Sequence, residues 1–127
     1  MPDSPLPRPT EAELSLLNIL WRRGPSTVRQ VLEDLPADTG YTTALKQLQI
    51  MSEKGLVTRD DKERSHVYAA TRPAEATRGQ LLDDLMERAF GGSAQQLVLQ
   101  ALSGKKPTRT ELAELRRIID SLEKKRP

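Results

Sequence analysis

The chain has 127 residues, of which 30% are charged and 3% aromatic, and its formal net charge is +2. This length allows one ordinary domain or two very small ones, and the composition is typical of a helix-rich protein rather than a β-sandwich. Cysteine is absent, which excludes disulfides and thiolate metal sites. His66 is the single histidine, so the sequence offers no set of side chains for catalysis. We therefore expect no enzyme, no metal and no cofactor.

The N-terminal segment, residues 1–9, carries prolines at positions 2, 5, 7 and 9. Proline lacks a backbone donor and favours extended chain, so the segment is predicted to be a disordered arm. Arg8 is a candidate for a minor-groove contact, as in some N-terminal arms, and a plain tail is the alternative.

Two short helices are predicted next. "TEAE" at 10–13 is a capping box, Gly24–Pro25 stops the helix, and its apolar side chains fall at helical spacing: Leu14, Leu17, Leu20 and Trp21. Ser26 is expected to cap a second helix in "TVRQVLEDL", residues 27–35, with the apolar positions Val28, Val31, Leu32 and Leu35.

A third helix and a hairpin follow. The helix is predicted over residues 41–54, ends at Gly55, and buries a stripe of Ala44, Leu45, Leu48 and Met51. "LVTR" at 56–59 indicates a strand, 60–64 a polar turn, and "SHVYAA" at 65–70 the return strand. Residues 10–72 are therefore predicted to form a winged helix-turn-helix domain.

From Pro73 onward the pattern predicts three more helices and no strand. "SAQQ" at 93–96 and "TRTE" at 108–111 are further capping boxes. Helices with this much apolar surface and so few residues have little to fold around alone, so residues 73–127 are predicted to be a dimerisation domain. Packing onto the first domain as one monomeric core is the alternative. The expected dimer contacts are Leu81, Leu85, Phe90, Leu97, Val98, Leu102, Leu112, Leu115, Ile119 and Leu122.

The exposed face of the third helix carries hydroxyls and amides. Gln pairs with adenine, Thr contacts thymine, and Lys reaches guanine or phosphate in a major groove that accepts one helix. On the wing, Lys62 and Arg64 lie at the tip, with His66 and Tyr68 alternating along one face of the return strand. The predicted DNA-binding residues are Tyr41, Thr42, Thr43, Lys46, Gln47, Lys62, Arg64 and His66. A solvated helix face and a solvated turn are the alternatives, since Asp60, Asp61 and Glu63 nearly cancel the local cations.

Three segments together resemble the penicillinase-repressor (BlaI/MecI/CopY-type) family of bacterial winged-helix repressors: "YTTALKQLQIMSEKGLV", "RDDKERSHVYAA" and "FGGSAQQLVLQAL". The resemblance runs from about Thr10 to Leu122. It implies a homodimeric repressor whose third helix reads a palindromic operator, often a TACA/TGTA-like dyad. It also implies release by a membrane sensor-protease or by copper.

The chain departs from that family's pattern at three places. The copper-responsive branch ends in clustered cysteines, and this chain has no cysteine. Ile50 stands where the family often has a basic residue. The scissile Asn–Phe pair of the protease-released branch would fall at Gln100–Ala101, which is the possible cleavage site here.

The sequence thus predicts a DNA-binding transcriptional repressor, and the competing class is a winged-helix protein-interaction module that uses the same face. The apolar runs are too short for a membrane span and the N-terminus has no secretory h-region, so we expect a cytoplasmic protein. The expected partners are operator DNA, a second copy of the chain, and a membrane sensor-protease.

Overall fold

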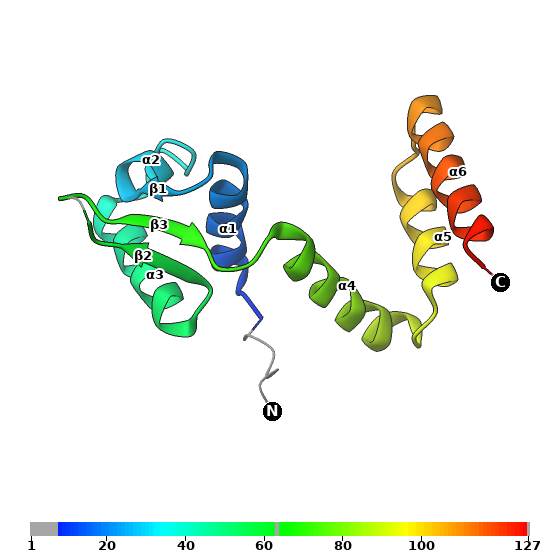
Figure 1. Ribbon diagram of the computed structural model, residues 1–127, viewed down its shortest axis with the longest axis horizontal. Helices are drawn as coiled ribbons and strands as arrows, with labels where there is room; N and C mark the ends of the chain where they lie inside the picture. Colours follow the sequence, from blue (N-terminus) through cyan, green and yellow to red (C-terminus); the bar gives the residue numbers. More distant parts are fainter. Residues whose placement is uncertain (1–7, 63, 127) are drawn as a thin grey trace. The chain divides into compact units, whose positions relative to one another are not determined.

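Six helices and three strands make up the part of the chain that this computed structural model describes, residues 8–62 and 64–126 (Figure 1). They divide into two compact units, the first running to Leu81 and the second starting at Leu82. The predicted fold class, mainly α with a small β-hairpin, is confirmed. Most of the predicted N-terminal arm, residues 1–7, lies outside the described residues.

Helix α1, Glu11–Arg23, begins and ends where the sequence predicts. The hydroxyl of Thr10 accepts a hydrogen bond from the Glu13 N–H at 3.2 Å, and the Glu13 carboxylate accepts one from the Thr10 N–H at 2.9 Å. Gly24 terminates the helix with a positive φ of 86°, a conformation that glycine adopts without steric cost.

The segment after α1 differs from the prediction. Ser26 does not cap the second helix; it lies in the two-residue strand β1, Ser26–Thr27, and Thr27 is the cap of α2, Val28–Leu32. Helix α2 is also shorter than predicted, because the N–H groups of residues 33–35 bond to carbonyls three residues back, which closes turns instead of extending the helix. Arg23 pairs there with Asp34 at 3.1 Å and holds the pKa of that carboxyl below its usual range.

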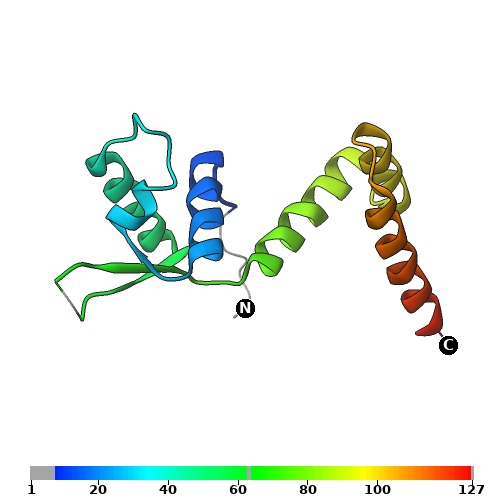
Figure 2. The same cartoon turned by 90° about the horizontal axis from the view of Figure 1, so that it is seen from above.

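Helix α3, Tyr41–Lys54, occupies the predicted residues and ends at Gly55, whose φ of 85° is left-handed. The hairpin β2, Val57–Asp60, and β3, Val67–Ala70, follows one or two residues later than predicted. β1 completes an antiparallel sheet of order β1-β3-β2, in which Ser26 and Arg59 pair with Tyr68 from either side. The hairpin extends beyond the helices of this unit in two views (Figures 1 and 2).

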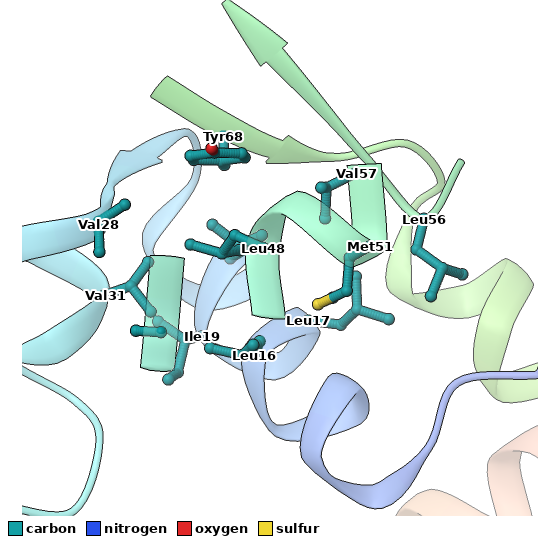
Figure 3. Close-up of a cluster of buried hydrophobic side chains, with 12 residues drawn as sticks. Leu16, Leu17, Ile19, Val28, Val31, Leu48, Met51, Leu56, Val57 and Tyr68 are labelled. Atoms are coloured by element: carbon teal, nitrogen blue, oxygen red, sulfur yellow. The ribbon is translucent and has the colours of Figure 1, made fainter. Parts of the chain in front are cut away.

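The core of the first unit lies between α1, α2, α3 and the sheet (Figure 3). Leu48 and Met51 of α3 are fully buried, as is Tyr68 of β3. These contacts hold the apolar side of α3 against the core, so the opposite side of the helix faces solvent. The buried apolar set is Leu16, Leu17, Ile19, Leu20, Val28, Val31, Ala44, Leu48, Met51, Leu56, Val57 and Tyr68.

One partly buried ion pair joins α1 to the last turn of α3. The Lys54 ammonium lies 2.7 Å from the Glu13 carboxylate, whose side chain is 3% exposed. Burial raises the pKa of Glu13, but the hydrogen bonds from Lys54 and from the Thr10 N–H outweigh it and hold the pKa below its usual value of 4.5. The stabilisation is therefore complete above about pH 4.5 and is lost as the pH falls through the lowered pKa.

Replacing Lys54 by Met is expected to destabilise the protein by about 2 kcal/mol near neutral pH. This loss is smaller than the roughly 3–5 kcal/mol that follows the breaking of a fully buried pair, because Lys54 is partly exposed. Urea unfolding measures the loss, which should shrink once acid protonates Glu13. Lys62→Met, at an exposed lysine outside any ion pair of the described residues, is the control. An equal loss at neutral and acid pH would contradict this role for Glu13.

Helix α4, Ala74–Phe90, begins in the first unit and continues into the second. Its first turns pack on α1: Thr77 is buried, the indole N–H of Trp21 donates to the Arg72 carbonyl at 2.9 Å, and the Arg78 guanidinium lies 6.0 Å from the Trp21 ring centroid. The first unit thus contains all of residues 10–72 and the first two turns of α4.

The second unit contains the rest of α4 and two further helices, α5, Ala94–Gly104, and α6, Arg109–Lys124. Thr108 and Glu111 form the predicted capping box of α6. At α5 only half of the predicted box forms: Ser93 accepts from the Gln96 N–H, whereas the Ser93 N–H donates to the Phe90 carbonyl. No residue of α5 or α6 is buried.

Candidate nucleic-acid interface

The outward side of α3 brings four polar residues and one apolar residue together. Three of its turns line one shallow hollow, formed by Thr42, Thr43, Lys46, Gln47 and Ile50. Gln47 is half-buried and the other four are exposed. This side faces away from Leu48 and Met51. Because those two residues pack in the core, the side of α3 that is predicted to read DNA bases faces solvent.

The N-terminus of α3 is capped by a glycine. Gly40 offers no side-chain hydrogen bond to the first turn of the helix. The first backbone N–H groups of a helix lack intrahelical partners, and together with the helix dipole they favour an anion. The start of α3 is therefore suited to a phosphate group, next to the residues that line the hollow.

A second hollow lies between α2, α3 and the hairpin. Its polar lining consists of Thr27, Arg29, Tyr41, Arg64, Ser65 and His66, and Val28 and Leu45 complete it. Tyr41, Arg64 and His66 were predicted to bind DNA. Thr27, Arg29 and Ser65 were not, and the only sequence signal for Arg29 was an exposed cation on the polar side of the second predicted helix.

Two acidic residues of the wing, Asp60 and Asp61, are engaged within the hairpin, and the third, Glu63, lies outside the described residues. The Asp61 carboxylate lies 2.8 Å from Arg59 Nε and 2.7 Å from His66 Nδ1. The Asp61 charge raises the pKa of Arg59. Asp60 accepts a hydrogen bond from the Lys62 backbone N–H at 2.9 Å. Both aspartates are thus turned to their own hairpin, and neither forms an ion pair with Lys62 or Arg64.

Cations of the first unit fall into two groups. Arg22, Arg23, Lys54 and Arg59 pair with carboxylates. Among the cations of α2, α3 and the hairpin, four make no ion pair with a described residue: Arg29, Lys46, Lys62 and Arg64. These four cations are therefore available to a polyanion at the surface formed by α2, α3 and the hairpin.

Two predicted placements on the wing need correction. Tyr68 does not share an exposed face with His66: it is fully buried in the core, whereas His66 is exposed and faces Asp61. The strand begins only at Val67, so His66 lies in the turn before it and the expected alternation does not reach it. Lys62 is exposed near the tip of the hairpin and lines neither hollow.

The described residues contain no group of three His, Asp or Glu side chains placed to hold a metal ion. Nor, over the same residues, does any helix combine the length and the apolar character that a membrane span requires. The first unit contains a short helix, a turn, and a helix with an outward polar side, flanked by a cationic hairpin. These features define a winged helix-turn-helix protein of the DNA-binding class.

Comparison with known proteins agrees with this class. Residues 9–121 match the family described as penicillinase repressor. The chain is 34% identical over 122 residues to the transcriptional regulator BlaI of Mycobacterium tuberculosis, in strains CDC 1551 / Oshkosh and ATCC 25618 / H37Rv, and the match covers 93% of this chain and 87% of that protein. The chain therefore belongs to the penicillinase repressor family, whose members are DNA-binding transcriptional regulators and not enzymes.

Two more distant similarities were found. A segment of 92 residues is 30% identical to ribosomal protein S6 kinase beta of Caenorhabditis elegans and covers 72% of this chain but 16% of the kinase. A solved structure of disulfide-formed AbfR has 20% identity and a TM-score of 0.44, and the alignment covers 91% of this chain and 68% of that chain.

Proposed function

We propose that the protein represses transcription by binding a palindromic operator as a homodimer, with α3 of each copy in the major groove. The observation that carries the proposal is the outward side of α3, where Thr43, Lys46 and Gln47 line one hollow on a helix fixed from behind by Leu48. These side chains read base edges, while Lys62 and Arg64 of the wing contact the phosphate backbone.

The second unit supplies the dimer in this proposal. Several of its large apolar side chains are half exposed or more, among them Leu85 at 50%, Ile119 at 57% and Leu122 at 59%. Exposed apolar surface of this extent needs a partner, and the three- and four-residue spacing along α6 is that of a helix pairing with another helix. Leu99 and Ile118, 51% and 53% exposed, join the residues predicted from sequence.

The same dimer offers a route to release. Gln100 and Ala101 are exposed and lie within α5. A protease binds its substrate as extended chain, so cleavage between them requires local unwinding of α5. Cutting there detaches α6 together with its apolar seam, which consists of Leu112, Leu115, Ile119 and Leu122. We propose that a membrane sensor-protease, if it acts on this chain, lowers operator affinity through loss of the dimer.

Base reading and backbone contact are expected to respond differently to mutation. Gln47→Ala should relax preference at one base pair per half-site and cost on the order of 1–3 kcal/mol of binding free energy. Arg64→Ala should weaken binding to all sequences alike and reduce its salt dependence. Anisotropy titrations with operator and with single-base variants of it separate the two effects. If Gln47→Ala left both affinity and base preference unchanged, α3 would not be reading the DNA in this register.

A further inference from the structure

The hollow between α2, α3 and the hairpin is lined by groups that bind anions. Its polar side chains are two arginines, three hydroxyls and a histidine, and no Asp or Glu of the described residues lines it. Its volume is about 150 Å³, whereas roughly 10–15 Å³ is enough to hold one water, so a tetrahedral anion fits. The three elements that line it come from separate parts of the chain, so the hollow exists only in the folded first unit.

Positive charge in this hollow is not neutralised from within the described residues. Arg29 and Arg64 make no ion pair there. Asp61 of the hairpin is already shared by Arg59 and His66. Since His66 uses Nδ1 for that contact, Nε2 is the ring nitrogen left for another partner.

Arg29 is held in place by an aromatic ring. Its guanidinium carbon lies 5.5 Å from the ring centroid of Tyr41, the first residue of α3. A guanidinium over a ring keeps its N–H edge free for hydrogen bonds, and its planar fork matches two oxygens of a phosphate. An anion held by Arg29 is therefore also fixed relative to the start of α3.

We infer that this hollow binds a single backbone phosphate of the operator, with Arg29 and Arg64 as its two cations and Tyr41 as the support that orients Arg29. The contact sets the register of α3 in the major groove, because the phosphate lies at a fixed distance along the helix from Thr43 and Gln47. The inference rests on the proposed function and adds a specific anchoring residue, Arg29, outside the recognition helix.

The experiment combines protein variants with neutral phosphates. Operator duplexes carry one methylphosphonate at each backbone position in turn, and binding is measured for the intact protein, Arg29→Gln and Arg29→Lys. Arg116→Gln, an exposed arginine of α6, is the control for loss of one charge. Thermal unfolding of each variant checks the fold. Arg29→Gln and one neutral phosphate per half-site are each expected to weaken binding about tenfold.

The decisive result is how the two losses combine. At one phosphate position, Arg29→Gln should cause no further loss of affinity once that phosphate is neutral. At all other positions the two losses should multiply. Arg29→Lys should recover part of the affinity, and Arg116→Gln should change the affinity little. Losses that multiply at every position would overturn the inference and leave the proposed function intact. The inference would also be overturned if inorganic phosphate competed with the operator at constant ionic strength while no operator position was sensitive to neutralisation. The hollow would then bind a free anion and not a phosphate of the operator. An intact protein that bound no operator would refute the proposed function and the inference together.

Discussion

Raising the salt concentration from about 50 to about 200 mM is expected to weaken operator binding by roughly a thousandfold, if six or more phosphate contacts form in the dimer. Each copy offers Arg29, Lys46, Lys62 and Arg64 as cations outside the ion pairs of the described residues. Lys46 is assigned to base reading, so the other three cations of each copy contact phosphates, and two copies supply six of them, the expected number of contacts. Released counterions then make the affinity fall steeply as salt rises.

The salt titration also separates the two classes of function. A winged-helix module that uses this face to hold a protein would lose far less affinity over the same range, since surface ion pairs contribute little. Anisotropy with a labelled operator, for the intact protein and for Arg64→Ala, gives both slopes. The variant should show the shallower slope. A flat response of the intact protein would favour the interaction module.

Truncation after Gln100 is expected to lower operator binding by roughly 100-fold or more at equal concentration, although every residue of the first unit is kept. The truncated chain lacks α6, which carries the apolar seam with Ile119 and Leu122. Two linked reading domains gain affinity because the second binds at high effective concentration, and that gain is lost when the link is broken. Sedimentation should show a monomer where the intact chain is a dimer.

A full-length variant tests the same contact without removing residues. Ile119→Asp places a charge in the seam of α6 and should dissociate the dimer and weaken operator binding in parallel. Ala113→Asp, at an exposed position on the side of α6 away from Leu115, Ile118 and Leu122, adds the same charge and should do neither. If the truncated chain bound the operator as tightly as the intact protein does, release through loss of the dimer would be ruled out.

The sequence predicted the elements whose signals are local. The capping boxes at Thr10 and Thr108 form as expected, and Gly24 and Gly55 end their helices with positive φ. The two-residue strand β1 has no such signal: it exists because Ser26 pairs with Tyr68, which is far away in sequence. That pairing moves the cap of α2 to Thr27. Elements defined by tertiary pairing are the ones that a local pattern misses.

The site divides in the same way. Thr43, Lys46 and Gln47 follow from the 3.6-residue period, because burial of Leu48 places them outward. Which charged side chains form ion pairs cannot be predicted from the spacing of residues along a helix or strand. The wing looked nearly neutral in sequence, whereas among the described residues Asp61 pairs with Arg59 and His66, and Arg64 makes no ion pair. Arg29 joins the site through its contact with Tyr41, which lies across the turn.

The most direct test of base reading by α3 is selection of bound sequences from a random DNA pool, with the intact protein and with Gln47→Ala in parallel. The intact protein should enrich a palindrome whose half-sites lie about one helical turn apart. Gln47→Ala should enrich the same palindrome with preference lost at one position in each half-site. An intact protein that enriches no sequence, or a Gln47→Ala variant whose selected site is identical at every position, would contradict the assignment of α3 as the reading helix.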